Sequence, residues 1–393
     1  TEESIRSVLK TMAEKDYSFR SFPVVDARGR LVGLISSNDI EFCVNHNLKV
    51  GQVMTKAKNL ITAADGISLK QAFAVMRKNK KKILPLVDKQ KKLAGMYVYS
   101  DVKRIITGGS PSYNVDANGN LRVGAAVGVG QEALERAELL SARGADVLVI
   151  DTAHGDSRAV LETLKKLKEK YSEIDIMAGN VSEAESAVRL VKAGADGVKV
   201  GQGPGSTCTT RIVAGIGCPQ VTAVYNCARA LRGSGVPVCA DGGIEYSGDI
   251  TVAIAAGAGS VILGRMLAGT SETPGEVFIR NGLPVKQYRG MGSLGAMQAS
   301  RGSRERYGQK EASKDKLVPE GVEAVVPFKG EVEKIIFQTL GGFRSGLGYV
   351  GACDIDELQS KADFHYISGA GLSESHPHGV TMEKEAPNYF GRV

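Results

Sequence analysis

The chain has 393 residues, of which 42% are apolar, and a formal charge of +7 at pH 7. This length and apolar content suffice for two or three packed domains. The apolar runs are too short to cross a bilayer, and the first residues, TEES, lack the parts of a secretory signal. We therefore expect a cytoplasmic protein. The modest charge and 6% aromatic residues favour small anionic ligands over nucleic acid.

The cysteine pattern points to free thiols. The sequence has six cysteines, with no C-x-x-C spacing and no disulfide-like density. They lie at positions 43, 208, 218, 227, 239 and 353.

Residues 1–107 contain an internal repeat. The segment 22–26, FPVVD, aligns with 84–88, LPLVD, and the alignment continues to Asp39 and Asp101. Each copy predicts an amphipathic helix, a strand, a polar turn and a second strand that ends at the aspartate. The helices are expected at about 5–12 and 69–76.

This repeat resembles a tandem cystathionine-β-synthase (CBS) module. The resemblance implies that the aspartate ending each copy holds the ribose of an adenine or guanine nucleotide, assisted by a hydroxyl residue three positions earlier. Ser36 fits that role in the first copy, but Val98 stands in its place in the second. A purely structural pair of repeats is the alternative.

A Gly-, Ser- and Pro-rich linker is expected at 108–120, followed by a second pattern in which a glycine ends a helix and an apolar strand follows. Such strands, apolar along their whole length, are typical of parallel strands buried on both faces. Six strands are predicted in this way, at 122–127, 147–151, 174–180, 198–201, 236–241 and 260–264.

These six strands predict an α/β fold, a (β/α)8 TIM barrel whose first two strands are absent from this chain. The repeat module is then an insertion before the third strand, which gives domains at 1–107 and 108–393. Glycine or polar residues follow each strand, where such barrels place their active sites. An open flavodoxin-like sheet is the alternative.

The loop 201–211, GQGPGSTCTTR, follows one of these strands. Three glycines in five residues let backbone N–H groups approach an anion, and Ser206 and Thr207 add hydroxyl donors. Cys208 on such a loop is a candidate nucleophile, and the donors and Arg211 are expected to lower its pKa. The alternative is a tight turn beside a buried cysteine.

Two further strand ends carry candidate phosphate ligands. Asp241-Gly242-Gly243 and Gly264-Arg265 would end strands seven and eight, where barrels often bind phosphate. Arg265 would supply a bidentate cation.

The segment 288–321 shows no sustained period and is rich in Gly, Ser and charged residues. It predicts a long loop, and such loops are usually lids. A mobile flap is therefore expected at about 288–329, where Arg306 and Tyr307 could enter an anionic site. A solvated charged loop is the alternative.

Taken together, the loop 205–211, the Asp-Gly-Gly turn, the segment YRGMGS at 288–293, the pair Arg306-Tyr307 and the inserted module resemble the IMP dehydrogenase and GMP reductase family, and the dehydrogenases in particular. The resemblance implies NAD-dependent oxidation of IMP to XMP, the committed step of guanine nucleotide synthesis. It also implies that the family's first two strands and a substrate-contacting loop are missing here.

The resemblance assigns roles to residues. Cys208 would form a thioimidate with IMP, which Arg306, Tyr307 and Thr210 then hydrolyse after NADH leaves. IMP would contact Ser206, Asp241, Gly242, Gly243, Gly264, Arg265, Tyr288, Arg289, Gly290, Met291, Gly292 and Glu320. The family often has Ser at the position of Arg265. NAD would face Asp151, Asn180, Gly201, Gln202 and Gly203.

The resemblance also implies a potassium ion on main-chain carbonyls, in a homotetramer or an octamer. Gly203, Gly205 and Cys208 match one subunit's share, and Glu374, Ser375 and His376 match the neighbour's. The pair His376 and His378 could instead suggest zinc, but no Cys or acidic cluster partners it.

Two other functions stay open from the sequence. GMP reductase shares the barrel, the cysteine loop and the Asp-Gly-Gly turn, but the Arg306-Tyr307 pair is typical of the dehydrogenase. A nucleotide-sensing regulator on a barrel scaffold would explain the repeat module. It would not need a thiol on a phosphate loop.

Overall fold

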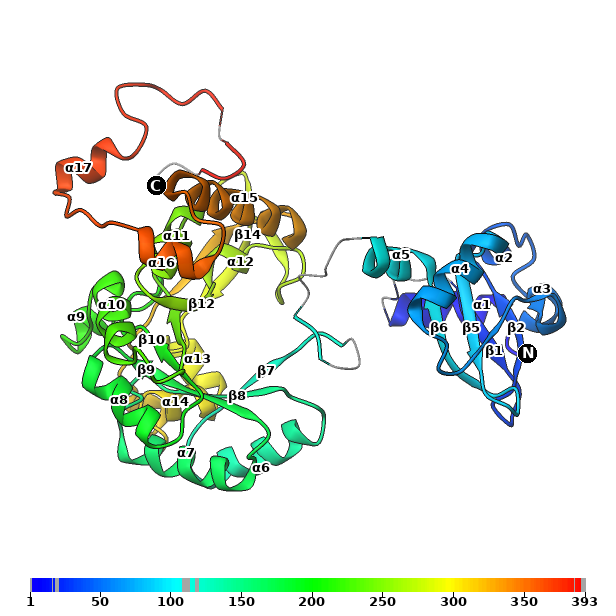
Figure 1. The fold of residues 1–393 in the computed structure, drawn as a ribbon, viewed down its shortest axis with the longest axis horizontal. Coiled ribbons are helices and arrows are strands. Elements are labelled where there is room, and N and C mark those ends of the chain that lie inside the picture. Colours follow the sequence, from blue (N-terminus) through cyan, green and yellow to red (C-terminus); the bar gives the residue numbers. More distant parts are fainter. Residues whose placement is uncertain are drawn as a thin grey trace. The chain divides into compact units, whose positions relative to one another are not determined.

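The computed structural model describes residues 2–15, 17, 21–107, 114–116, 120–384 and 386–389. It divides into two compact units, Thr1–Asn114 and Val115–Val393 (Figure 1). Most of the predicted linker, 108–113 and 117–119, lies outside the described residues. Among the described residues, no helix is both long enough and apolar enough to cross a membrane.

The first unit consists of two similar halves, each with a small sheet and flanking helices. Both predicted helices are present, and each begins at a serine whose hydroxyl accepts a backbone N–H of the first turn. The first half has α1 Ile5–Glu14, β1 Phe22–Val25, β2 Leu31–Ile35, α2 Ser37–Glu41, α3 Val50–Val53 and β3 Thr55–Lys56. The second half has β4 Ala63–Ala64, α4 Leu69–Asn79, β5 Ile83–Val87, β6 Leu93–Val98 and α5 Tyr99–Thr107.

The two halves meet through equivalent turns. The backbone N–H of Leu31 donates to the carbonyl of Lys91 at 3.0 Å, and that of Leu93 donates to the carbonyl of Gly29 at 3.0 Å. These pairs exchange under the 62-residue offset of the repeat (93 − 31 and 91 − 29). The repeat in the sequence therefore corresponds to a local, approximate two-fold symmetry between the two halves in the structure.

The prediction that each aspartate of the repeat ends a strand is wrong. Both aspartates lie in the first turn of the helix that follows the strand. Ser36 and Asp39 form a capping box at the start of α2, with the Ser36 hydroxyl 2.7 Å from Oδ2 of Asp39. Asp101 lies in the first turn of α5. A carboxylate is favoured there by the helix dipole and by free N–H groups, so the S-x-x-D spacing has a local structural cause.

The second unit is built on six parallel strands, all of which were predicted. They pair in sequence order, β12-β11-β10-β9-β8-β7, so each strand neighbours the next along the chain. In a flavodoxin-like sheet the strands would not pair in sequence order, because the strand order changes direction at a switch point. The fold is that of a (β/α)8 barrel, of which this chain supplies six strands. The strands are β7 Gly124–Val127, β8 Val147–Asp151, β9 Asp175–Val181, β10 Gly197–Val200, β11 Val238–Asp241 and β12 Ala258–Ile262.

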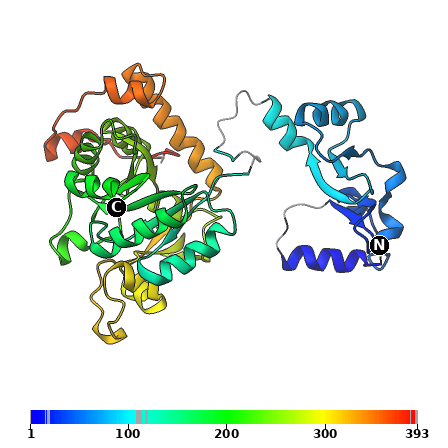
Figure 2. The same cartoon turned by 60° about the horizontal axis from the view of Figure 1, so that its bottom comes forward.

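Helices connect these strands and cover their outer face (Figure 2). Side chains that alternate along the strands, such as Val198 and Val200 on β10, are fully buried in the main core. The residue between them, Lys199, is also buried. The connecting helices are α6 Gly130–Ser141, α7 Arg158–Lys170, α8 Ala184–Lys192, α9 Thr210–Val213, α10 Gln220–Ala230 and α11 Ser247–Ala255, and a short helix, α12 Arg265–Ala268, follows β12.

The predicted long loop at 288–321 is wrong in detail, because the segment carries regular structure. Two six-residue helices and a short 3-10 helix lie within it, and the strands of an antiparallel sheet of order β13-β14-β15 flank it. Ser293 caps α13 and Ser300 caps α14, and elements this short show no detectable period in sequence. The elements are β13 Val277–Arg280, β14 Leu283–Arg289, α13 Leu294–Ala299, α14 Arg301–Arg306, η2 Lys314–Lys316 and β15 Glu323–Pro327.

Among the described residues after β15 there are three helices. The longest, α15, packs against α11 of the barrel and ends at Gly351 in the left-handed conformation. The helices are α15 Val332–Val350, α16 Ile355–Lys361 and α17 Gly369–Glu374.

Candidate active site

The glycine loop leaves β10 and passes close to the end of β11. Gly201 has φ +150°, and a Cβ there would lie 2.1 Å from the carbonyl oxygen of Asp241. Gly203 has φ +80° and faces the side chain of Arg211. These two positions need glycine because a side chain would meet backbone or a packed stem. The loop that carries Cys208 is thereby packed on the turn after Asp241, where Gly242 lies against Pro204 and Gly205.

Cys208 joins a hydrogen-bonded chain with two other predicted residues. Its Sγ lies 3.2 Å from Oγ1 of Thr210, which donates to Oε2 of Glu320 at 2.8 Å. The backbone N–H of Thr209 donates to the carbonyl of Glu320 at 2.9 Å. Residues more than a hundred positions apart in sequence are thus held around one thiol.

Arg211 contacts the backbone of its own loop and of the residues that follow it. Its guanidinium donates to the carbonyl of Cys218, and its stem packs against Gly203 and Gly217. Arg211 therefore braces the loop.

Most of the other cysteines are held in the neutral thiol form. Burial raises the pKa of Cys227 to about 12 and raises the pKa values of Cys218 and Cys239. The pKa of Cys353 is raised mainly by its hydrogen bond with Glu357. All six cysteines are unpaired. Since the thiolate is the reactive form, these four are poor nucleophiles at neutral pH.

Arg306 and Tyr307 are docked inside the site. The Arg306 guanidinium forms an ion pair with Asp151 at the end of β8, and its carbonyl accepts the N–H of Ala153 at 3.1 Å. The Tyr307 ring packs on Gly292, where a Cβ would lie 2.6 Å from it. The predicted flap therefore lies over the ends of the barrel strands, at a position predicted to face NAD.

Burial changes the acid–base properties of this pair. Burial lowers the pKa of Arg306, because a charged guanidinium loses hydration, while Tyr307 acts in the opposite direction. Burial raises the pKa of Tyr307, and the nearby charges of Cys208 and Glu320 raise it further, against the effect of Arg306. The ion pair with Asp151 favours the charged form of Arg306 and so opposes the effect of burial on its pKa.

Surface ion pairs fix the base of the flap to α6. Glu132 accepts from Arg301 at 3.1 Å and from Lys310 at 3.3 Å, and Lys310 also reaches Glu305 at 3.2 Å. Exposed pairs of this kind contribute little individually, so this attachment is readily reversible.

A buried lysine that the sequence analysis did not select lies between two predicted subsites. Lys199 on β10 donates to Oδ1 of Asp151 at 2.6 Å, to Oδ2 of Asp241 at 2.8 Å and to the amide oxygen of Asn180. The amide nitrogen of Asn180 donates to Asp241 at 2.9 Å and to the carbonyl of Gly201 at 2.8 Å. The available signal was one charged residue inside an otherwise apolar strand, GVKV.

A cavity of about 1590 Å³ opens next to the cysteine loop. Ser206, Arg265 and Tyr288, three of the predicted substrate residues, line it. Gly264 lies beside the Tyr288 hydroxyl, and the Gly242-Gly243 turn packs on Pro204. These contacts place the predicted phosphate-binding residues close to the loop that carries Cys208.

Arg265 is already paired in this structure. Its guanidinium contacts Oε1 of Glu245, which lines the same cavity, and both side chains are partly exposed. An incoming phosphate would have to compete with Glu245 for this cation.

The segment after β14 lies against the cysteine loop. The N–H of Gly290 donates to the carbonyl of Val322 at 3.1 Å, and a Cβ at Gly290 would lie 3.0 Å from Oγ1 of Thr207. Arg289 and Met291 are exposed on either side. The predicted base-contacting residues therefore adjoin Cys208.

The residues predicted to face NAD form a hydrogen-bonding set at the ends of β8, β9 and β10. Asp151, Asn180 and Gly201 share the Lys199 network, and the Gln202 amide donates to the carbonyl of Ala153 at 3.0 Å and accepts from Ser182 at 2.6 Å. Carboxylate and amide groups of this kind suit ribose hydroxyls and a carboxamide, so the residues fit a nicotinamide cofactor.

The predicted potassium ligands form two separate groups in this chain. The Gly205 carbonyl accepts the N–H of Cys208 at 3.0 Å and retains a second lone pair for an ion. His376 instead lies against Tyr389, with Nδ1 2.9 Å from its hydroxyl, and edge-on to Tyr246. Carbonyl oxygens of this sort suit a hard cation. Within the described residues, no three His, Cys, Asp or Glu side chains form a metal cluster.

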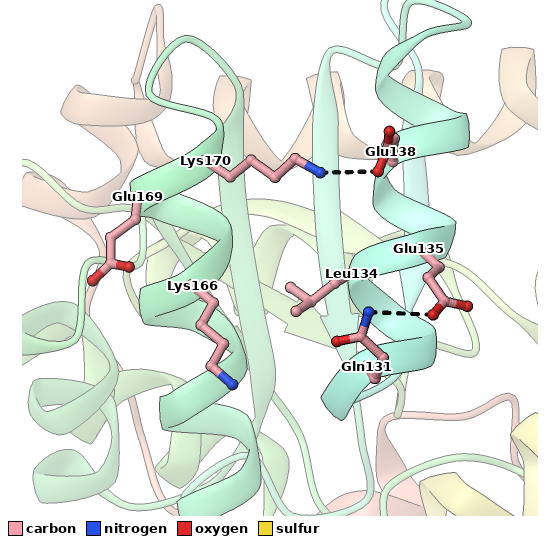
Figure 3. Close-up of a pocket in the computed structure, with 7 residues that line it drawn as sticks. All are labelled: Gln131, Leu134, Glu135, Glu138, Lys166, Glu169 and Lys170. Atoms are coloured by element: carbon pink, nitrogen blue, oxygen red, sulfur yellow. Dashed lines mark hydrogen bonds and ion pairs between the residues drawn. The ribbon is translucent and has the colours of Figure 1, made fainter.

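A second pocket, of about 410 Å³, lies between α6 and α7 (Figure 3). Four of its polar side chains are paired with one another, since Lys170 donates to Glu138 at 2.9 Å and Gln131 to Glu135 at 3.2 Å. It includes no predicted site residue. The lining residues are Gln131, Leu134, Glu135, Glu138, Lys166, Glu169 and Lys170.

Fold and site together define a barrel enzyme with a cysteine beside a large cavity that Ser206 and Arg265 line. A model of the IMP dehydrogenase / GMP reductase domain matches residues 26–378, and a CBS domain model matches residues 1–43. The chain belongs to the IMP dehydrogenase / GMP reductase family.

Individual relatives agree with this assignment. The chain is 50% identical over 388 residues to inosine-5'-monophosphate dehydrogenase of Aquifex aeolicus, covering 98% of this chain and 78% of that protein. It is 48% identical over 375 residues to that of Bacillus subtilis, covering 95% and 75%. A crystal structure of a Trypanosoma brucei GMP reductase variant with guanosine 5'-monophosphate is similar, with TM-score 0.85, 39% identity, and 97% and 78% coverage.

Proposed function

We propose that this enzyme oxidises IMP to XMP with NAD, using Cys208 as the nucleophile. The observation that carries the proposal is the docked Arg306-Tyr307 pair beside the chain from Cys208 through Thr210 to Glu320. A thiol that attacks, and a flap that brings a base after the first step, are the two parts that a dehydrogenase of this kind requires. Relatives that are about half identical over nearly the whole chain are named inosine-5'-monophosphate dehydrogenase, which supports the proposal.

In the first half-reaction, the Cys208 thiolate adds to carbon 2 of the hypoxanthine ring. The phosphate is held by Ser206, Gly243, Gly264 and Arg265. Asp241 accepts hydrogen bonds from the ribose hydroxyls. The segment 288–292 and Glu320 border the base. Asp151, Asn180 and the loop 201–203 would hold NAD, which would accept the hydride from carbon 2. A covalent thioimidate remains on Cys208.

In the second half-reaction, the flap enters the space by Asp151. Arg306 then takes a proton from water, assisted by Tyr307 and Thr210, and the resulting hydroxide attacks the thioimidate carbon. XMP leaves as the Cys208 thiolate is released. Burial of Arg306 favours its neutral form, which is the form that accepts a proton.

The direct test is the absorbance of NADH formed by the intact protein with IMP and NAD. Equal activity with other purine monophosphates would contradict the substrate assignment. GMP reductase is the second candidate, favoured by the TM-score of 0.85 to such an enzyme. That activity would consume NADPH with GMP and form no NADH from IMP, so the two assays separate the candidates.

We also propose a potassium-dependent homotetramer in the cytoplasm. The carbonyls of Gly203, Gly205 and Cys208 would supply one subunit's ligands, and residues 374–376 of a second copy would supply the rest. Light scattering is expected to give a tetramer, and turnover is expected to fall several-fold without potassium. A fully active monomer that is insensitive to potassium would contradict this.

The CBS unit is proposed to regulate turnover and to take no part in it. Its candidate nucleotide ligands are Asp39 and Asp101, and Asp39 is engaged with Ser36 at the start of α2. Deletion of residues 1–107, with a short linker, is expected to keep turnover within about tenfold of the intact protein, because the barrel unit has its own core. A folded but inactive deletion protein would refute this.

A further inference from the structure

Lys199 is a charged residue in the barrel interior, where burying an ammonium group costs free energy of hydration. The residue is 2% exposed, in the middle of β10, and its three ammonium protons have three acceptors: Asp151, Asp241 and Asn180. An ammonium group has three donors and no acceptor, so its hydrogen-bonding capacity is fully used.

The two carboxylates are close enough to repel each other strongly. Their Lys199-bound oxygens lie 2.6 and 2.8 Å from Nζ, so these oxygens are at most 2.6 + 2.8 = 5.4 Å apart. Unscreened like charges at this separation oppose each other, more so in a partly buried site than in water. A cation between them is required if both are to stay ionised and in place.

Asp151 divides its two oxygens between two cations. Oδ1 accepts from Lys199 and Oδ2 pairs with Arg306. With Asp241 included, two carboxylates face two cations and the cluster is balanced. Arg306 belongs to the flap, which moves in the proposed mechanism, whereas Lys199 belongs to the barrel strand β10.

We propose that Lys199 is a positioning residue that holds Asp151 and Asp241 in place, linking the carboxylate that faces the substrate to the carboxylate that receives the flap. The inference rests on the proposed function for the identity of the two subsites. It adds that one fixed lysine serves both half-reactions, first by orienting Asp241 for the substrate and then by keeping Asp151 ready for Arg306.

The test is equilibrium dialysis of IMP without any cofactor. Lys199→Met is expected to weaken IMP binding by roughly tenfold or more, since Asp241 loses its charged partner and faces Asp151 directly. Lys199→Arg keeps the charge and is expected to recover most of the affinity. If Lys199→Met folds and binds IMP as tightly as the wild type does, the inference is overturned.

Lys286 provides a matched control for removing a buried lysine. It is 1% exposed, and its ammonium donates to the carbonyl of Thr270 at 3.0 Å and to Oγ1 of Thr273 at 3.1 Å. No carboxylate depends on it in the bonds described. Lys286→Met is expected to lower the Tm while leaving IMP affinity within about twofold. An equal loss of IMP affinity in Lys199→Met and Lys286→Met would mean that Lys199 contributes only to general stability. That result would overturn the proposal.

A double variant separates charge balance from packing. In Lys199→Met with Asp151→Asn, one charge of each sign is removed, so Asp241 no longer faces a second carboxylate. IMP affinity is expected to recover relative to Lys199→Met alone, which is a positive coupling between the two sites. Additive losses would overturn the inference. If Lys199→Met does not fold, the balanced double variant must fold, and failure of both would equally overturn it.

The wild-type assay keeps this test separate from the proposed function. If the wild type binds IMP but forms no NADH, the proposed activity fails, whereas the Lys199 variants still report on how the IMP site is held.

Discussion

The Cys208→Ala protein is expected to form no NADH from IMP while binding IMP nearly as tightly as the wild type. The thiolate is the only group in the Cys208-Thr210-Glu320 chain able to form the covalent adduct, because the hydroxyl of Thr210 is a far weaker nucleophile. Removing a nucleophile typically costs at least about four orders of magnitude in turnover. The phosphate and ribose contacts come from other residues, so affinity should persist.

Cys353→Ala is the matched control, since Cys353 is exposed and lies between α15 and α16, outside the site. It should retain full activity. Covalent labelling by a 6-chloropurine nucleotide should be lost only in the Cys208 variant. Labelling at any other cysteine, with Cys208 unmodified, would refute the assignment.

The barrel strands were predictable from sequence because parallel strands buried on both faces leave a strong signal. Runs such as VLVI at 147–150 are apolar throughout and follow a glycine that ends a helix. The ends of these strands then locate Asp151, Gly201 and Asp241 without further information. Boundaries differ by one or two residues, as at β9 and β12.

The flap could not be predicted in the same way. Helices α13 and α14 have six residues each, less than two turns, so no hydrophobic period develops. Their only local signal is a serine cap at each start. The partner of Arg306 was also hidden, because Asp151 lies 155 positions earlier (306 − 151) and a long-range ion pair leaves no periodic trace.

Lys199 shows a different limit of sequence reasoning. A strand assignment treats GVKV as an apolar run, and the lysine is then overlooked as an exposed or tolerated exception. Its burial is possible because Asp151, Asn180 and Asp241 converge from three neighbouring strands. Only the order of pairing, β8-β9-β10-β11, reveals that convergence.

The Arg306→Ala protein is expected to separate the two half-reactions. Hydride transfer needs Cys208, IMP and NAD, whereas hydrolysis needs the base that docks at Asp151. A rapid burst of about one NADH per site should therefore precede turnover slowed by roughly two to four orders of magnitude, the usual cost of removing a positioned base. Stopped-flow absorbance measures both phases.

Arg304 provides the control for this experiment, because it lies in the same helix and donates to the carbonyl of Met297 at 2.9 Å, away from Asp151. Arg304→Ala should keep both the burst and the steady rate within about fivefold of the wild type. If Arg306→Ala instead loses the burst and the steady rate equally, Arg306 acts in binding or hydride transfer, and the flap mechanism fails.

The pH dependence of the slow phase tests the role of Arg306 as a base independently. Only the neutral guanidine accepts a proton, and burial lowers the pKa of Arg306, so the neutral fraction grows as pH rises toward that pKa. The hydrolysis rate of the wild type should therefore increase with pH. Since the ion pair with Asp151 favours the charged form of Arg306, Asp151→Asn should shift this increase to lower pH. Arg306→Ala should lose this rise. A pH profile unchanged by Arg306→Ala would mean that another group takes the proton, even if the burst survives.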